Sequence, residues 1–194
     1  MPLALALLAW MIGNNNAAPT HGLVRDPAVL EFHVRATDPL VHAWIVNGAA
    51  ESRALRDLLA DLIASDVIVH VELVDRIPGG ALGQLAFVTA TPTVRYLRVQ
   101  VVRVAGRADM IALIAHELQH AAEIAGERGV RDVKSMAKFY LGLHENGSDA
   151  RRYDSLLART TESIVRREVL SHRGVPTDEL QFAAQFPRGT QAVR

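Results

Sequence analysis

The residues with the clearest chemical potential form one pentapeptide, His116-Glu117-Leu118-Gln119-His120. On a helix, the two histidines stand four positions apart, so both imidazoles project from one face and can share a metal ion such as zinc. Glu117 follows the first histidine and can act as a general base toward water held at that metal. The spacing therefore predicts a metal site with its own proton acceptor.

The pentapeptide lies in the middle of an apolar stretch with the pattern of a helix. Asp109 is a plausible N-cap and Gly126 a plausible C-terminal stop. Between them the apolar positions are Met110, Ile111, Leu113, Ile114, Leu118, Ala121, Ala122, Ile124 and Ala125. The competing interpretation is a pair of core histidines that share hydrogen bonds with a glutamate. Packing alone gives no reason for this spacing, so the metal site is the better prediction.

Composition sets broad bounds on the function. The chain has 194 residues, 49% hydrophobic and 22% charged, which is typical of one globular domain. Lys+Arg and Asp+Glu both number 21, so no basic surplus indicates nucleic acid as a partner. The absence of cysteine excludes disulfides, thiolate metal ligands and a cysteine nucleophile.

The N-terminal residues 2–13 form an apolar run that is too short to span a bilayer, so no stable membrane insertion is expected. Residues 1–18 are interpreted as a signal peptide or as an N-terminal apolar helix. No Lys or Arg precedes Arg25, so the charged start of a signal peptide is missing. Cleavage would place the protein outside the cell or in the periplasm, whereas a retained helix would leave it cytoplasmic.

The rest of the chain predicts an α+β fold in which a small mixed or antiparallel sheet is followed by the motif helix and C-terminal helices. Residues 19–49 are expected to form an irregular arm, with strand-like patches in 30–46 broken by Asp38-Pro39. Residues 50–175 are expected to form the catalytic domain and 176–194 a tail. The expected elements inside the domain are helices over 50–64, 131–143 and 153–171, strands over 67–74, 84–89 and 93–104, and a loop at 146–148.

This arrangement resembles the zincin metallopeptidases over residues 50–170, with specificity at the pentapeptide. It is also similar to small uncharacterised bacterial proteins that carry an HELQH-type helix. The resemblance implies Zn²⁺ as cofactor, His116 and His120 as ligands and Glu117 as the base. The metzincin subgroup would need Gly and His where this chain has Glu123 and Gly126, which excludes it.

The gluzincin pattern remains, and it implies a third ligand from a later helix. Glu162 is the predicted ligand because it shares a helical face with Ala158, Val165 and Val169. A carboxylate on an inward face needs a partner or a metal. Alternatively, Glu162 pairs with an arginine, Arg159 or Arg166, on a solvated face. Gluzincins often carry an aspartate where this chain has Arg166. Glu168 is the second candidate, Glu123 is expected to reach past the metal, and Asp149, Asp154 and His144 stay open.

The predicted function is a zinc-dependent hydrolase, most simply a peptidase that cleaves amide bonds with zinc-activated water. Peptide or protein substrates are the expected partners, and the segment 79–87 or the strand over 93–104 could pair with an extended peptide. The alternatives are a catalytically silent zincin-like binding or regulatory module and a metal-free structural protein. The residues that could stabilise an oxyanion are Tyr140, Tyr153, His144 and His172. The oligomeric state does not follow from the sequence.

Overall fold

The fold contains a four-stranded mixed sheet. The computed structural model describes residues 33–143 and 154–172. The strands lie in the order β1 (Val34–Ala36), β2 (Val67–Val74), β4 (Arg95–Val102) and β3 (Gly83–Ala90). β1, β2 and β4 are parallel, whereas β3 pairs antiparallel with β4 at the edge of the sheet. The prediction of an α+β fold with a small mixed sheet is confirmed.

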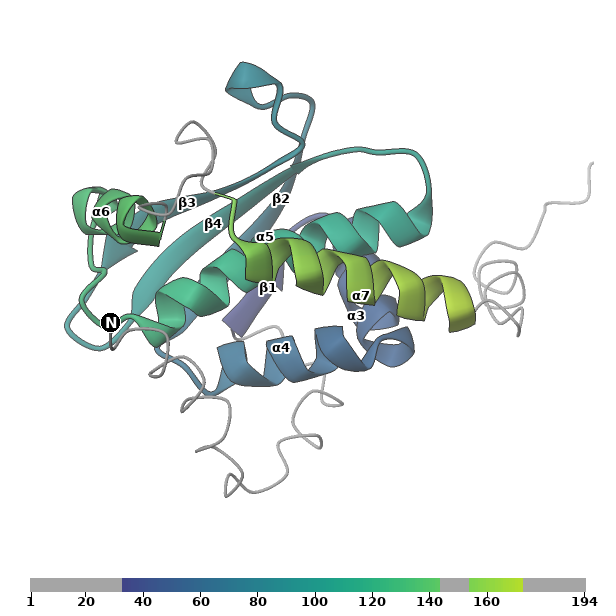
Figure 1. The fold of residues 1–194 in the computed structure, drawn as a ribbon, viewed down its shortest axis with the longest axis horizontal. Coiled ribbons are helices and arrows are strands. Elements are labelled where there is room, and N and C mark those ends of the chain that lie inside the picture. The colour runs from purple at the N-terminus through teal and green to yellow at the C-terminus, as the bar shows by residue number, and fades with distance from the viewer. Residues whose placement is uncertain (1–32, 144–153, 173–194) are drawn as a thin grey trace, which may run out of the picture.

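Five α-helices accompany the sheet within the described residues (Figure 1). They are α3 (Pro39–Glu51), α4 (Arg53–Ile63), α5 (Arg107–Gly126), α6 (Val133–Leu143) and α7 (Leu156–His172). A short 3₁₀ turn, η2 (Pro78–Gly80), follows β2. None of the described helices combines the length and apolar character needed to cross a bilayer.

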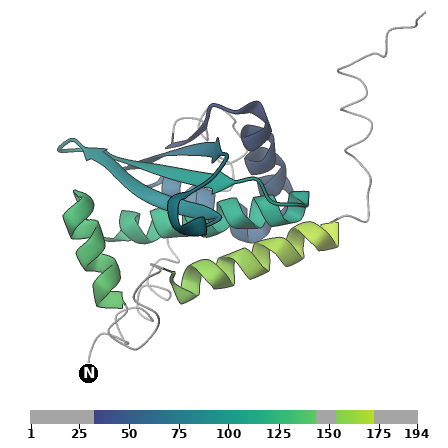
Figure 2. The same cartoon turned by 90° about the horizontal axis from the view of Figure 1, so that it is seen from above.

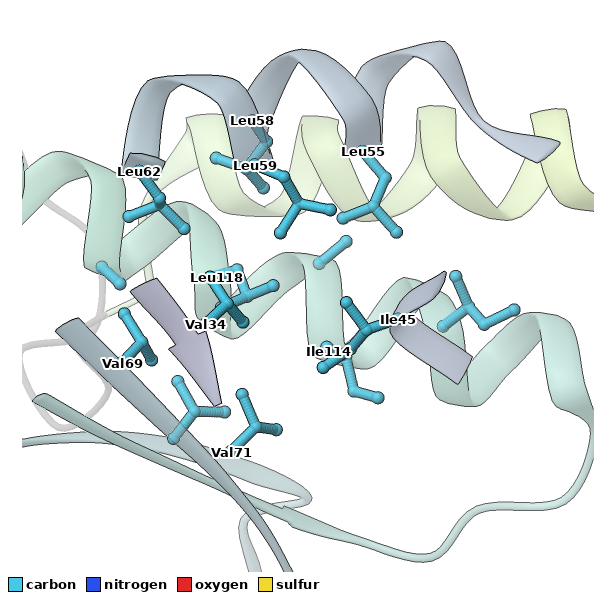
Figure 3. Close-up of a cluster of buried hydrophobic side chains, with 14 of the residues drawn as sticks. Val34, Ile45, Leu55, Leu58, Leu59, Leu62, Val69, Val71, Ile114 and Leu118 are labelled. Carbon is cyan, nitrogen blue, oxygen red and sulfur yellow. The ribbon is translucent and has the colours of Figure 1, made fainter. Parts of the chain in front are cut away.

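The motif helix α5 is the central element of the fold. It contacts β2, β3 and β4 on one side and α7 on the other, so it lies between the sheet and α7 (Figure 2). Leucines of α4, Ile114 and Leu118 of α5, and valines of the sheet form one buried cluster (Figure 3). Because α5 is covered on two sides, its backbone is held firmly, and the side chains it projects toward α7 keep fixed positions.

Within residues 33–49, the described part of the predicted arm over 19–49, the structure corrects the expectation of irregular backbone. Residues 34–36 form β1, and residues 39–49 belong to α3. Asp38 and Pro39, read as a break between strand-like patches, instead begin the helix. The Asp38 side chain accepts a hydrogen bond from the backbone N–H of Leu40 (2.7 Å), and proline suits the first helical position.

A second boundary also differs from the expected one, because α4 begins at Arg53 and not at residue 50. Ser52 separates α3 from α4, and its hydroxyl accepts from the backbone N–H of Leu55 (3.1 Å). Glu168 of α7 adds a second cap. Its Oε2 accepts from the Ser52 hydroxyl (2.6 Å) and from the backbone N–H of Ala54 (3.1 Å). The positive end of the α4 dipole also stabilises a carboxylate at this position.

The start of α5 is another correction. The helix begins at Arg107, and its N-cap is Gly106 at φ 92°, with no side-chain cap. Asp109 lies inside the first turn, where its carboxylate accepts from Nε of Arg166 at 2.9 Å. The helix ends at Gly126, as predicted.

The C-terminal end of α5 is held by Arg95, which is fully buried. Its guanidinium donates to the carbonyls of Ile124 (2.6 Å) and Ala125 (2.9 Å) at the end of the helix. Nε and NH2 also form a two-point ion pair with Asp66, at 3.0 and 2.5 Å. A cation suits this end of a helix, where unpaired carbonyls gather.

Candidate metal centre

Helices α5 and α7 face each other through a row of polar contacts. Side chains of α7, or of the residue just before it, form hydrogen bonds with side chains of α5. The pairs, with the α5 residue second, are Ser155 and Glu123, Thr161 and Gln119, Glu162 and His116, and Arg166 and Asp109. Residue numbers rise along α7 as they fall along α5, so the two helices are antiparallel (Figure 1). This antiparallel packing of α7 on α5 positions the site.

The two motif histidines and Asp154 form the one group of potential metal ligands among residues 33–143 and 154–172. One ligand atom from each of these three residues lies within 4.8 Å of the others. The two imidazole rings approach edge to face, with centroids 5.0 Å apart. Two imidazoles and a carboxylate at this spacing could hold a divalent metal ion.

His116 contacts one carboxylate at each ring nitrogen. Its Nδ1 lies 3.0 Å from Oε2 of Glu162, and its Nε2 lies 3.5 Å from Oδ1 of Asp154. Because an ionised carboxylate only accepts, Nδ1 carries the proton in the shorter contact and Nε2 is the ligand atom. Burial, and then the neighbouring His120, lowers the pKa of His116. A neutral imidazole is the form that binds a metal.

His120 is held in the same way by its own helix. Its Nδ1 lies 3.0 Å from Oε2 of Glu123, three residues further along α5. The Tyr140 ring of α6 packs edge to face on the imidazole at 5.6 Å between centroids. The Tyr140 hydroxyl donates to the His120 carbonyl (3.3 Å). These contacts orient the ring and leave its Nε2 as the ligand atom.

Glu117 is buried, with 5% of its surface exposed, where α5 meets the start of β3. A Cβ at Gly83 would lie 2.2 Å from Oε1 of Glu117, so the carboxylate occupies space that only a glycine leaves open. Burial raises the pKa of Glu117 to about 7. A carboxylate with that pKa exchanges protons readily near neutral pH. The sequence did not single out Gly83.

Glu162, the predicted third ligand, lies at the site but outside the group of three ligand atoms. Its Oε2 is taken by Nδ1 of His116, and its Oε1 accepts from NH2 of Arg166 at 2.6 Å. The inward direction expected for this residue is correct, since its side chain is only 26% exposed. The alternative pairing with Arg166 is also present, at a half-buried position.

The surroundings of the Asp154 carboxylate indicate whether the site suits a metal ion. Its Oδ1 is buried and has no hydrogen-bond partner, although it lies beside Nε2 of His116. Its Oδ2 is 3.8 Å from Nε of Arg159. A buried carboxylate oxygen without a partner is costly, and a bound cation would remove that cost. The residues present therefore fit a metal ion.

The remaining sequence candidates fall elsewhere. Glu168 caps α4, and the Tyr140 hydroxyl donates to the His120 carbonyl and to Glu123 (3.5 Å). His172 is exposed at the last position of α7. The predictions that lie outside the described residues concern His144, Asp149, Tyr153, the loop at 146–148, residues 1–32 and the tail from 176.

In comparisons with known proteins, no family model, curated protein or solved structure matches the chain. The assignment of a function therefore depends on the geometry of the site.

Proposed function

We propose that the protein is a zinc-dependent hydrolase that cleaves peptide amide bonds, with Glu117 as general base. The observation that carries this proposal is the buried, unpartnered Oδ1 of Asp154, which faces Nε2 of His116 within the three-residue ligand group. An acceptor oxygen and an imidazole nitrogen placed this way are expected at a cation site.

In this proposal, His116, His120 and Asp154 hold the metal. Asp154 is preferred to Glu162 because both oxygens of Glu162 already have partners, His116 and Arg166. Glu162 then keeps the His116 ring in the orientation that presents Nε2, as a carboxylate behind a ligand histidine commonly does. Glu162 as a ligand stays a prediction that metal binding by its variants can test.

A bound zinc ion supplies Lewis-acid activation of water and of a substrate carbonyl. Glu117 supplies the proton acceptor. Its carboxylate sits next to the first ligand in sequence and is held in a recess at Gly83, so its position is fixed before substrate arrives. It would accept a proton from the attacking water and return it to the leaving amine.

The edge of the sheet supports a peptide as the substrate class. β3 pairs with β4 on one side only, and its first residue, Gly83, lies against Glu117. The open side of an edge strand offers backbone N–H and C=O groups to an extended chain. A peptide bound there would run past the base, which favours a peptide over a small ester or amide.

Metal analysis combined with one substitution tests the proposal. The purified protein should carry about one zinc ion per chain and hydrolyse members of a broad peptide library. Glu117→Gln should keep the zinc and lose turnover, whereas the control Glu127→Gln, exposed near the end of α5, should behave as the parent.

Two other outcomes support the alternatives. Tightly bound zinc without hydrolysis would indicate a silent zincin-like module. No zinc, together with normal folding of His116→Ala, would indicate a metal-free structural protein.

A further inference from the structure

Glu123 connects three elements around the candidate metal centre. Its Oε2 lies 3.0 Å from Nδ1 of His120 and 3.5 Å from the Tyr140 hydroxyl of α6. Its Oε1 accepts a hydrogen bond from the hydroxyl of Ser155, at the start of α7. The side chain is 10% exposed, so these contacts are poorly replaced by water.

We infer that Glu123 is a positioning residue that sets two metal ligands at once: His120 directly, and Asp154 through the docking of the α7 N-terminus. This inference rests on the proposed function, because it assumes that Asp154 is a ligand.

The link to Asp154 passes through Ser155. The Ser155 hydroxyl accepts from the backbone N–H of Ala158 (2.9 Å), as an N-cap does, and donates its own proton to Glu123. One hydroxyl therefore caps α7 and fastens that cap to α5. Asp154 immediately precedes Ser155, so the place of its carboxylate depends on this fastening.

The chemistry explains why a glutamate is needed at position 123. A carboxylate accepts at both oxygens, and its two oxygens here accept hydrogen bonds from an imidazole N–H and from a hydroxyl. A glutamine has one acceptor oxygen, and its amide N–H₂ would face one of the two donors. Glutamine can therefore accept a hydrogen bond from His120 or from Ser155, but not from both.

His116 is supported differently. The partner of its Nδ1, Glu162, belongs to α7 and is held by Arg166, and neither of these two contacts involves Glu123 or Ser155. Loss of Glu123 should therefore affect His120 and Asp154 together, while His116 keeps its contact with Glu162.

The test compares zinc affinity, by competition with a chelator, with thermal stability in a set of full-length variants. Glu123→Gln should lower zinc affinity by roughly ten- to a hundredfold, the usual effect of removing a group that orients a metal ligand. Ser155→Asp keeps an N-cap oxygen but loses the hydroxyl donor and faces the Glu123 carboxylate, so it should lower zinc affinity while α7 stays capped. Ser155→Thr keeps both functions and should restore zinc binding.

Matched controls separate this role from a general loss of stability. Glu127→Gln lies one turn further along, and Ser163→Ala is exposed on α7. Both should bind zinc as the parent does. Glu123→Gln and Ser155→Asp with parental zinc affinity would overturn the inference.

Nitrogen NMR of the histidine rings in metal-free protein gives a readout that does not need the proposed function. In the parent, His120 should be protonated at Nδ1, and Glu123→Gln should shift that preference, while His116 keeps its proton at Nδ1 beside Glu162. Unchanged His120 signals would overturn the role of Glu123 even if the parent bound no zinc. Absence of zinc from the parent, with the His120 shift present, would instead reject the metal site and the link to Asp154 and retain only the orientation of His120.

Discussion

Nδ1 of His116 and Oε2 of Glu162 lie 3.0 Å apart across the contact between α5 and α7. Nε2 of the same ring lies 3.5 Å from Asp154. One imidazole thus contacts a carboxylate at each nitrogen. The two carboxylates differ in their second partner, because Arg166 donates a hydrogen bond of 2.6 Å to Glu162, whereas Arg159 lies 3.8 Å from Asp154. This asymmetry assigns different roles to Glu162 and Asp154.

The two carboxylates should therefore respond differently to substitution. Glu162→Gln should lower zinc affinity by about ten- to a hundredfold, because it disturbs the orientation of a ligand. Asp154→Ala should lower it by more than this range, because it removes a ligand. Chelator competition measures both affinities. A larger loss for Glu162→Gln than for Asp154→Ala would make Glu162 the third ligand, as the sequence first predicted.

The close approach of Gly83 to Glu117 allows a test of Glu117 as the general base. A Cβ there would lie 2.2 Å from Oε1 of Glu117, so Gly83→Ala must displace the carboxylate. The carboxylate is the far end of a flexible side chain, and Gly83 has no positive φ, so the fold should tolerate alanine. We expect zinc affinity close to that of the parent and a fall in kcat/KM of about 100-fold, within the range of general base catalysis.

Gly126→Ala is the matched control for that experiment, because a Cβ at position 126 meets nothing within 4 Å. It should leave peptide hydrolysis unchanged. Full activity in Gly83→Ala would mean that Glu117 does not need the position it occupies.

Much of the scaffold was predictable, because the elements follow local patterns. The alternation in β4 placed Leu97, Val99 and Val101 in the core, and the motif helix ends at Gly126 as expected. The N-terminal half was misread at Asp38-Pro39. The same pair can break a strand or begin a helix, and the outcome depends on Val41, Trp44 and Ile45 finding a buried face.

The site itself was only partly predictable, because its geometry comes from tertiary packing. The pentapeptide identifies two histidines, but the third group depends on which residue α7 brings opposite them. Asp154 precedes that helix, so no helical periodicity marks it. Gly83 is likewise visible only once β3 and α5 are in contact.

Asp66 and Arg95 give a prediction about the pH dependence of stability. The hydrogen bonds from Arg95 lower the pKa of Asp66 below its usual value of 3.8. A carboxyl group whose pKa is lower in the folded state binds fewer protons there than in the unfolded state. Its stabilisation is therefore fully present above pH 3.8 and is lost as the pH falls through the folded pKa.

Asp66→Asn should accordingly cost about 2 kcal/mol at pH 7, the scale of hydrogen bonds between charged groups. The Asp66 side chain is 34% exposed, and solvent screening keeps the loss below that of a fully buried pair. Urea unfolding at several pH values measures it. The difference between parent and variant should shrink below pH 3.8, and a difference that grew there would contradict the assignment.

The Glu168 carboxylate has a structural role that can be distinguished from metal binding. It accepts from the Ser52 hydroxyl at 2.6 Å and from the Ala54 N–H at 3.1 Å, so it caps α4 from α7. Glu168→Ala should lower the free energy of unfolding by about 1 kcal/mol, the typical effect of losing a helix cap, and leave zinc affinity unchanged. The exposed neighbour Arg167→Ala is the control for stability. Loss of zinc in a folded Glu168→Ala protein would return Glu168 to the set of candidate ligands, whereas zinc retained at parental affinity would limit its role to joining α7 to α4.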